Sequence, residues 1–341
     1  MIEYQGIQHY SYNASWKCSK DAFEDGQIRD NLKREYCIKN SINLIEIPYW
    51  DFNKINYEYI KEKNRAIGDK MNYHSDKWIN NQVKEHYEEA LTIFPRDKIL
   101  GIFYQGSANY SLDYIGSDVD TKCIVLPSLE DICLNKQPTS YTHVRANNEH
   151  IDFKDLRVIS RDFLKQNINF LEILFTKYRI INEDYEKLFD RMFTYNEDIA
   201  RYDNYRFIRA TAGMSMEKLK ALTLDRPSQH DEIIKYSWAS KQLHHLMRLN
   251  TFIKRWVNDE AFENCLIDPR SEYLTMIKQD GHSMFTLDEA KFLAKKYDDE
   301  TNAIKEEYIA THEHVINDAV GRMVDDIVVD VVRESLKKEI G

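Results

Sequence analysis

Two aspartates separated by a single residue, Asp118 and Asp120, follow the pair Gly106-Ser107 after ten intervening residues. Side chains two positions apart on a β-strand point to the same face of the sheet. Two carboxylates on one face repel each other and raise each other's pKa unless a cation lies between them. Magnesium, or manganese in its place, is the expected cation, because a hard ion prefers carboxylate and phosphate oxygens.

The glycine–serine pair is suited to hold phosphate. Residues 98–104 are an apolar run of strand length, so a strand is predicted to end just before Gly106. A helical turn beginning at Ser107 would present free backbone N–H groups and a hydroxyl to the oxygens of a triphosphate. Ser107 could also cap that turn, and the two roles are compatible.

A third carboxylate usually completes a cage that clamps two metal ions roughly 3.5–4 Å apart. After the strand expected at 121–126, the next predicted strand covers 149–153 and carries Asp152. We therefore take Asp152 as the candidate third ligand, with Glu149 in reserve.

The spacing of these residues resembles the signature of the DNA polymerase β-type nucleotidyltransferase superfamily, which is Gly-Ser followed at this distance by Asp-Val-Asp. The surrounding sequence, roughly residues 80–290, resembles the RNA-repair-pathway branch of that superfamily. The segments that carry this likeness are 106–110, 117–122, 151–157, 167–175 and 241–248. One departure is Thr121, which stands where the family has an apolar residue, although threonine also suits a strand.

The resemblance implies a palm built on a mixed sheet, a helical domain, magnesium, and transfer of a nucleoside monophosphate from an NTP to an acceptor hydroxyl. It implies that Gly106 and Ser107 contact the nucleotide phosphates and that Asp118 and Asp120 bind metal. Asp152 would then be the third metal ligand, the carboxylate that activates the acceptor hydroxyl.

The segment 241–248 supplies the second part of the implied nucleotide site. Lys241 and Arg248 would meet phosphate charge from the helical side. Their helical spacing, shared with His245, leaves one solvated helix face as the alternative. Tyr110 could stack on a base or could simply belong to the core.

Residues 1–50 are predicted to form a strand–helix–strand unit that resembles the second half of a PD-(D/E)xK nuclease domain of the very-short-patch-repair type. In that family a carboxylate and a Lys or Gln two residues apart on a strand bind metal beside an earlier Asp, and Glu3 and Gln5 fit this pair. The earlier Asp would lie before Met1. We therefore expect a truncated or degenerate remnant that is inactive by itself.

The chain as a whole is predicted to be an α+β protein in four parts. These are the nuclease-like unit (1–50), a linker (51–75), a nucleotidyltransferase palm (76–158) and an all-helical C-terminal domain (159–341). Ten glycines and six prolines in 341 residues favour helices over many short strands. Residues 286–337 are predicted to be a near-continuous helix, and the β-branched run at 327–332 leaves a strand as the competing interpretation.

The composition restricts the classes of partner. A net charge of −10 argues against a broad nucleic-acid-coating surface but leaves room for a local basic groove. The five cysteines include no C-x-x-C pair, which is poor material for a disulfide framework or a zinc site. No apolar run approaches the roughly 18 residues needed to span a bilayer, and the N-terminus lacks a signal peptide's apolar core. We expect a reduced, cytoplasmic protein with no membrane partner, and an oligomer remains open.

The expected activity is magnesium-dependent nucleotidyl transfer from an NTP, and the repair-pathway likeness suggests an RNA end as the acceptor. Modification of a protein hydroxyl (nucleotidylylation) is the second enzymatic hypothesis. The hypothesis from a different functional class is a non-catalytic nucleic-acid-binding protein of a phage or defence locus. An active nuclease would require the missing carboxylate from a second chain.

Overall fold

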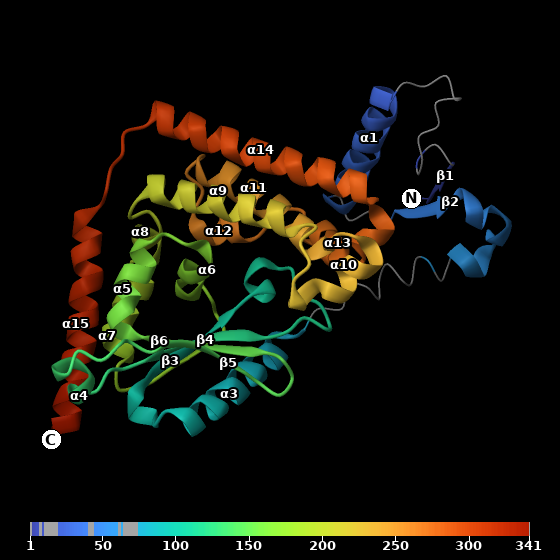
Figure 1. Ribbon diagram of the computed structural model, residues 1–341. Helices are drawn as coiled ribbons and strands as arrows, with labels where there is room; N and C mark the ends of the chain where they lie inside the picture. Colours follow the sequence, from blue (N-terminus) through green and yellow to red (C-terminus); the bar gives the residue numbers. More distant parts are fainter. Residues whose placement is uncertain are drawn as a thin grey trace.

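A five-stranded mixed sheet forms the layer that carries the candidate aspartates (Figure 1). The computed structural model describes residues 2–6, 9, 20–39, 44–60, 63 and 74–340. Across the sheet the strands are β5 (Ser140–Val144), β6 (His150–Asp155), β4 (Asp120–Val125), β3 (Ile99–Gln105) and β7 (Arg179–Ile181). β4 runs parallel to β6, and the other neighbouring pairs are antiparallel.

The interior strand β3 is apolar along most of its length because both of its faces are covered. Helix α3 (Asp76–Ile93), whose first turn is capped by the Ser75 hydroxyl, covers one face through Ile79 and Val83. On the other face, Phe103 of β3 belongs to the large core of the C-terminal helices. The sequence of a strand covered on both faces is a continuous apolar run and does not alternate between apolar and polar residues.

Helices dominate the chain after β6. They are α5 (Leu156–Leu164), α6 (Ile168–Leu171), α7 (Glu186–Thr194), α8 (Asn196–Ala200), α9 (Asn204–Ala221), α10 (His230–Tyr236), α11 (Ser240–Trp256), α12 (Phe262–Leu266), α13 (Ser271–Met284), α14 (Leu287–Thr311) and α15 (Asp318–Ile340), with a short 3₁₀ turn η5 (Glu172–Leu174) after α6. Helix α11 is buried over most of its length, packing against α9, α13 and α14. Within the described residues, no helix combines the length and apolar character needed to cross a bilayer.

The predicted near-continuous helical stretch at 286–337 is formed by two helices, because the chain leaves the helix between α14 and α15. There the Asn317 N–H donates to the Tyr202 carbonyl over 2.9 Å, and His314 lies 3.1 Å from the Asp203 carboxylate. After this break, α15 runs along α5 and α7 back to the sheet (Figure 1). The competing strand interpretation for 327–332 is wrong, since these residues lie within α15.

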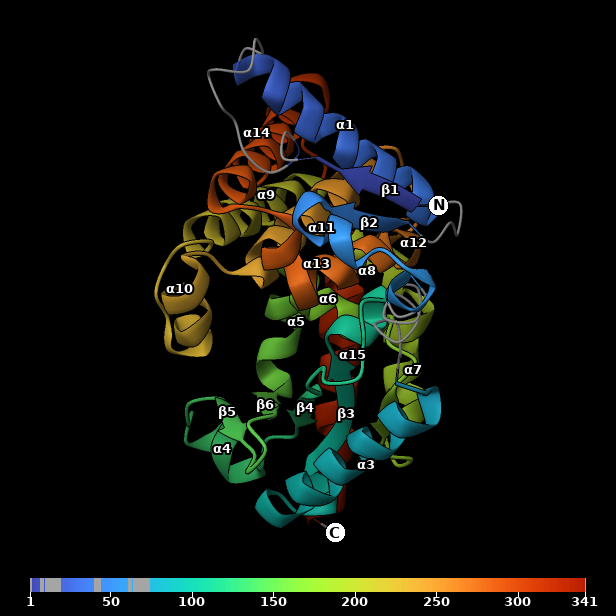
Figure 2. The ribbon, with the colours of Figure 1, turned by 90° about the vertical axis from the view of Figure 1, so that its right-hand side faces the viewer.

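The N-terminal unit is a strand–helix–strand arrangement, as predicted. β1 (Ile2–Gln5) pairs in parallel with β2 (Ile45–Pro48), and α1 (Lys20–Lys39) lies against α13 (Figure 2). In the predicted linker, residues 49–54 form a 3₁₀ helix (η2, Tyr49–Lys54), whereas 61–62 and 64–73 lie outside the described residues.

The polar side chains of this N-terminal unit bond to one another. Lys33 pairs with Glu3, the Gln5 amide donates to Glu46, and Asp30 lies 2.6 Å from His9. The two residues predicted to match the nuclease motif, Glu3 and Gln5, therefore both have protein partners.

Candidate active site

A tight turn follows β3 and forms one edge of the candidate site. Gly106 has φ +133° and ψ −155°, a conformation that essentially only glycine adopts. Ser107–Tyr110 then form a 3₁₀ turn (η4), closed when the Leu112 N–H donates to the Ser107 carbonyl over 2.9 Å. The buried Tyr104 hydroxyl accepts a hydrogen bond from the Ala108 N–H at 3.1 Å.

This turn differs in detail from the predicted one. A helical turn of 3₁₀ type begins at Ser107, as predicted, but Gly106, not Ser107, occupies the N-cap position. The capping role considered for Ser107 is therefore wrong. Both residues line the pocket described below, so their predicted contact with phosphate stays a prediction.

Asp118 and Asp120 line the same pocket, although only one of them lies on a strand. β4 begins at Asp120, and Asp118 is exposed in the preceding loop, so the expectation that both lie on the strand is wrong. Burial, together with the nearby charge of Asp118, raises the pKa of Asp120. The Asp120 carboxylate accepts from the His150 N–H at 3.0 Å, which ties β4 to β6.

Asp152 shares a sheet face with Asp120 but lies farther along the strands. It pairs in register with Lys122, two residues beyond Asp120, and its carboxylate accepts from the Lys122 ammonium group at 2.7 Å. Asp152 is not among the side chains that line the pocket. Among the described residues, no three His, Cys, Asp or Glu side chains form a metal-holding group. The role of Asp152 as third ligand stays a prediction.

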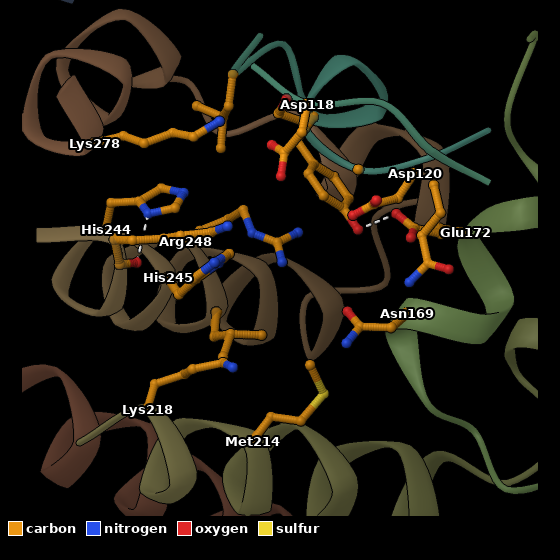
Figure 3. A pocket seen from close by; sticks show the side chains of 17 residues that line it. Asp118, Asp120, Asn169, Glu172, Met214, Lys218, His244, His245, Arg248 and Lys278 are labelled. Atoms are coloured by element: carbon orange, nitrogen blue, oxygen red, sulfur yellow. Dashed lines mark hydrogen bonds between the residues drawn. The ribbon is translucent and has the colours of Figure 1, made fainter. Parts of the chain in front are cut away.

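The opposite wall of the pocket is cationic and comes from the helical region (Figure 3). Helix α11 contributes Lys241 and Arg248, α9 contributes Lys218, and α13 contributes Lys278. The alternative of a solvated α11 face is wrong for Arg248, which is only 3% exposed.

Two histidines of α11 lie among these cations. His244 and His245 both line the pocket, and burial lowers the pKa of each well below its usual value. They therefore add neutral polar groups to the wall at neutral pH, and not positive charge.

Arg248 is the most informative residue of this wall. Its guanidinium carbon lies 3.8 Å from the centre of the Tyr110 ring, and its Nε and Nη1 atoms are buried without a hydrogen-bond partner. A buried donor without a partner costs about 1–3 kcal/mol, and buried charge is normally paired. The charge of Arg248 already acts on the buried Glu172 and Tyr110, and an anionic ligand in the pocket would supply the acceptors that Nε and Nη1 lack.

Three further ionisable residues of the pocket, Glu172, Lys218 and Lys278, were not predicted from the sequence. Glu172 of η5 is 1% exposed and accepts a hydrogen bond from the Tyr110 hydroxyl, and burial raises its pKa to about 7. Lys278 donates to the Ser117 hydroxyl at 3.2 Å, and burial, followed by the charge of Lys241, lowers its pKa to about 8.

The sequence signals that could have pointed to these three residues differ. Glu172 lies inside the segment 167–175, which carries part of the family likeness, so its place in the site could have been suspected. Lys218 and Lys278 lie on helices far apart in the sequence, with no motif around them.

Comparison with known proteins gives short, local similarities. No family model matches the chain. Over 62 residues, 18% of this chain, it is 42% identical to "Uncharacterized protein 307L" of Invertebrate iridescent virus 6. Over 48 residues, 14% of this chain, it is 46% identical to "Uncharacterized protein 033L" of Invertebrate iridescent virus 3. The matches span 32% and 25% of these two relatives, respectively.

Proposed function

We propose that this chain is a magnesium-dependent nucleotidyltransferase that moves a nucleoside monophosphate from an NTP to an acceptor hydroxyl. The observation that carries the proposal is the division of charge in one pocket. Asp118 and Asp120 lie where β4 begins, and Arg248, whose Nε and Nη1 atoms have no hydrogen-bond partner, lies on the opposite wall with Lys218 (Figure 3). Lys241 lines the same pocket. A metal–triphosphate complex has the complementary division, with a cation at one end and anionic oxygens at the other.

The donor set fits magnesium or manganese without a complete protein cage. Magnesium is usually held by one or two carboxylates together with substrate phosphates. Asp118 and Asp120 would supply the carboxylates, and the raised pKa of Asp120 reflects burial beside a like charge, which a cation would relieve. When bound, the ion would supply charge neutralisation for the phosphate oxygens and lower the pKa of a nearby hydroxyl.

The residues of the chain would then orient the nucleotide. The 3₁₀ turn beginning at Ser107 offers the Ser107 hydroxyl to the same pocket as the carboxylates, whereas its Ala108 and Asn109 N–H groups already donate to the Tyr104 hydroxyl and the Gly106 carbonyl. Arg248, Lys241 and Lys278 would hold phosphate oxygens from the other side, so that the α-phosphate faces the acceptor. Positioning of this kind supplies much of the rate in phosphoryl-type transfer.

The sheet and its helices support the finer assignment of a nucleotidyltransferase palm, although strand β7 joins the sheet from residues 179–181, beyond the predicted palm (76–158) and within the region predicted to be all-helical. β3 leads into the Gly106-Ser107 turn, and antiparallel β4 brings Asp120 back beside Gln105 at the same edge. β6 lies parallel to β4 on its other side. A mixed sheet is what the family resemblance implies for the palm.

The acceptor is proposed to be an RNA end, on the likeness to the repair-pathway branch alone. Protein nucleotidylylation uses the same nucleotide pocket and differs only in the acceptor, so one experiment separates the two. All four NTPs, each labelled at the α-phosphate, would be incubated with Mg²⁺ and either cellular RNA or lysate protein.

We expect label to appear on RNA with the wild-type chain and to be lost with Asp118→Ala. Label on protein instead would establish the nucleotidylylation alternative. No transfer of any of the four labels to RNA, protein or the chain itself would refute catalysis and favour the non-catalytic binding role.

A further inference from the structure

A buried carboxylate behind the candidate metal-binding segment holds that segment's backbone. Glu149, 7% exposed, accepts a hydrogen bond at Oε1 from the Val119 N–H over 3.1 Å. Val119 is the residue between Asp118 and Asp120. The peptide group between Asp118 and Val119 is therefore held by a side chain that does not itself line the pocket.

His86 of α3 extends this contact to the other side of Asp120. It is fully buried, with Nε2 lying 3.0 Å from Glu149 Oε2 and Nδ1 lying 2.9 Å from the Thr121 hydroxyl. Because an ionised carboxylate only accepts, Nε2 carries the proton and Nδ1 accepts from Thr121. Burial lowers the pKa of His86, which agrees with a neutral ring in that tautomer. The residues before and after Asp120 are thus held by one hydrogen-bonded pair.

Glu149 itself is saturated with donors. Its Oε2 atom also accepts from Arg145 and Asn147, each at 2.7 Å. Burial alone would raise the pKa of Glu149, but the hydrogen bonds from His86, Asn147 and the Val119 N–H outweigh it, and the pKa lies below its usual value. A carboxylate engaged in this way has little capacity left for a metal ion. These hydrogen bonds favour a different role for Glu149 from that of third metal ligand, for which it was the reserve candidate.

We propose that Glu149, together with His86, is a positioning residue that presents Asp118 and Asp120 jointly to a divalent cation. Two carboxylates close to one another repel, so without restraint the loop carrying Asp118 would turn away in the metal-free protein. The hydrogen-bonded pair of Glu149 and His86, here called the clamp, opposes that movement before the ion binds. The functional consequence rests on the proposed function, because only a metal site at these aspartates makes their joint orientation matter.

The test compares divalent-cation affinity in matched variants of the full chain. Glu149→Gln keeps the size of the side chain but cannot accept at both oxygens, which disturbs the bonds to His86 and Arg145. Glu89→Gln is the control, because Glu89 bonds to Arg145 and His143 in the outer part of the same network without touching residues 118–121. Mn²⁺ binding followed by electron paramagnetic resonance measures affinity without relying on catalysis.

We expect Glu149→Gln to weaken Mn²⁺ binding about 10- to 100-fold, the usual effect of losing such an outer partner, and Glu89→Gln to change it less than about twofold. With label transfer as readout, a higher concentration of Mg²⁺ should restore the Glu149→Gln rate, whereas a merely structural role predicts a loss that added metal does not rescue. Thr121→Val removes only the far end of the clamp and serves if Glu149→Gln does not fold. We expect it to weaken Mn²⁺ binding in the same direction.

The outcomes separate this inference from the proposed function. Unchanged Mn²⁺ affinity in Glu149→Gln, or an equal loss in both Glu variants, overturns the positioning role while leaving transfer by the wild type intact. Metal binding that responds as expected, without any label transfer, overturns the proposed function and keeps the positioning role. A wild-type chain that binds no divalent cation overturns both.

Discussion

Replacement of Arg248 by methionine should affect the free and the nucleotide-bound protein in opposite ways. In the free protein Arg248 is 3% exposed and two of its nitrogen atoms, Nε and Nη1, have no hydrogen-bond partner, at a cost of about 1–3 kcal/mol each. The contact of its guanidinium with the Tyr110 ring returns about 0.5–2 kcal/mol. Methionine has a similar length, packs against an aromatic ring and carries no unpaired donors.

The difference of these terms gives an expected stability change of Arg248→Met between about 0 and 5 kcal/mol, in the direction of a larger free energy of unfolding. The expected change in nucleotide affinity is large. A hydrogen bond to a charged group contributes about 1.5–3 kcal/mol, so two such bonds at the lower limit give about 3 kcal/mol. This corresponds to roughly a 100-fold rise in the Kd for NTP.

Chemical denaturation and calorimetric NTP titration measure the two effects separately. Arg255→Met is the matched control, because Arg255 lies on the same helix and donates to Glu260 and to the carbonyls of Asn264 and Ile267. We expect the control to lose stability and keep NTP affinity. A loss of several kcal/mol of stability in Arg248→Met, with NTP affinity unchanged, would refute the assignment of Arg248 to phosphate.

Three further predictions concern single residues of the pocket. Burial raises the pKa of Glu172 to about 7, above its value of about 4.5 in the unfolded chain, so its contribution to stability should fall as the pH rises between these values. Glu172→Gln should lack this fall, which is on the order of 3 kcal/mol, when its denaturation is compared with that of the wild type at acidic and alkaline pH. Lys278, with its pKa lowered to about 8, should lose charge above that pH, so kcat/KM should decline there in the wild type and stay level in Lys278→Arg, as a pH–rate profile would show. Gly106→Ala should destabilise the protein by about 1–3 kcal/mol and raise KM for NTP, because φ is +133° and the added Cβ would lie 3.3 Å from the Tyr104 hydroxyl; a thermal melt and steady-state kinetics measure both.

The parts of the fold that the sequence predicted well are those with strong patterns. Helix α3 begins at Asp76 as expected, and β3, β4 and β6 lie within a residue or two of their predicted bounds. β5 and β7 were not predicted. β5 is almost entirely exposed, and β7 has only three residues, so neither produces an apolar run or a clear alternation.

The break between α14 and α15 could not be predicted from local sequence. Residues 312–317 contain neither glycine nor proline. The helix ends there because Asn317 and His314 bond to the Tyr202–Asp203 segment, and these contacts exist only after the helices have packed. Tertiary contacts routinely override local propensity in this way.

The candidate site was predictable to the extent that it lies in contiguous motifs. The segments around Gly106 and Asp118, and the helix with Lys241 and Arg248, were predicted from spacing and resemblance, and the structure brings them to one pocket. Lys278 arrives from α13 through packing alone. The position of Asp152 relative to Asp120 could not be predicted, because it depends on the register of β4 with β6, which places Asp152 two residues beyond Asp120.

The central claim is that Asp118 and Asp120, on one side of the pocket, and the cationic wall opposite them bind one metal–nucleotide complex together. It is tested most directly by the linkage between Mn²⁺ and a non-hydrolysable NTP analogue, measured by electron paramagnetic resonance in the wild type, Asp120→Asn and Arg248→Met. Because coupling between two ligands is reciprocal, a shared site predicts that the analogue raises Mn²⁺ affinity at least about tenfold in the wild type and far less in either variant. Independent binding of the two ligands, or an equal effect of the analogue in all three proteins, would contradict the account.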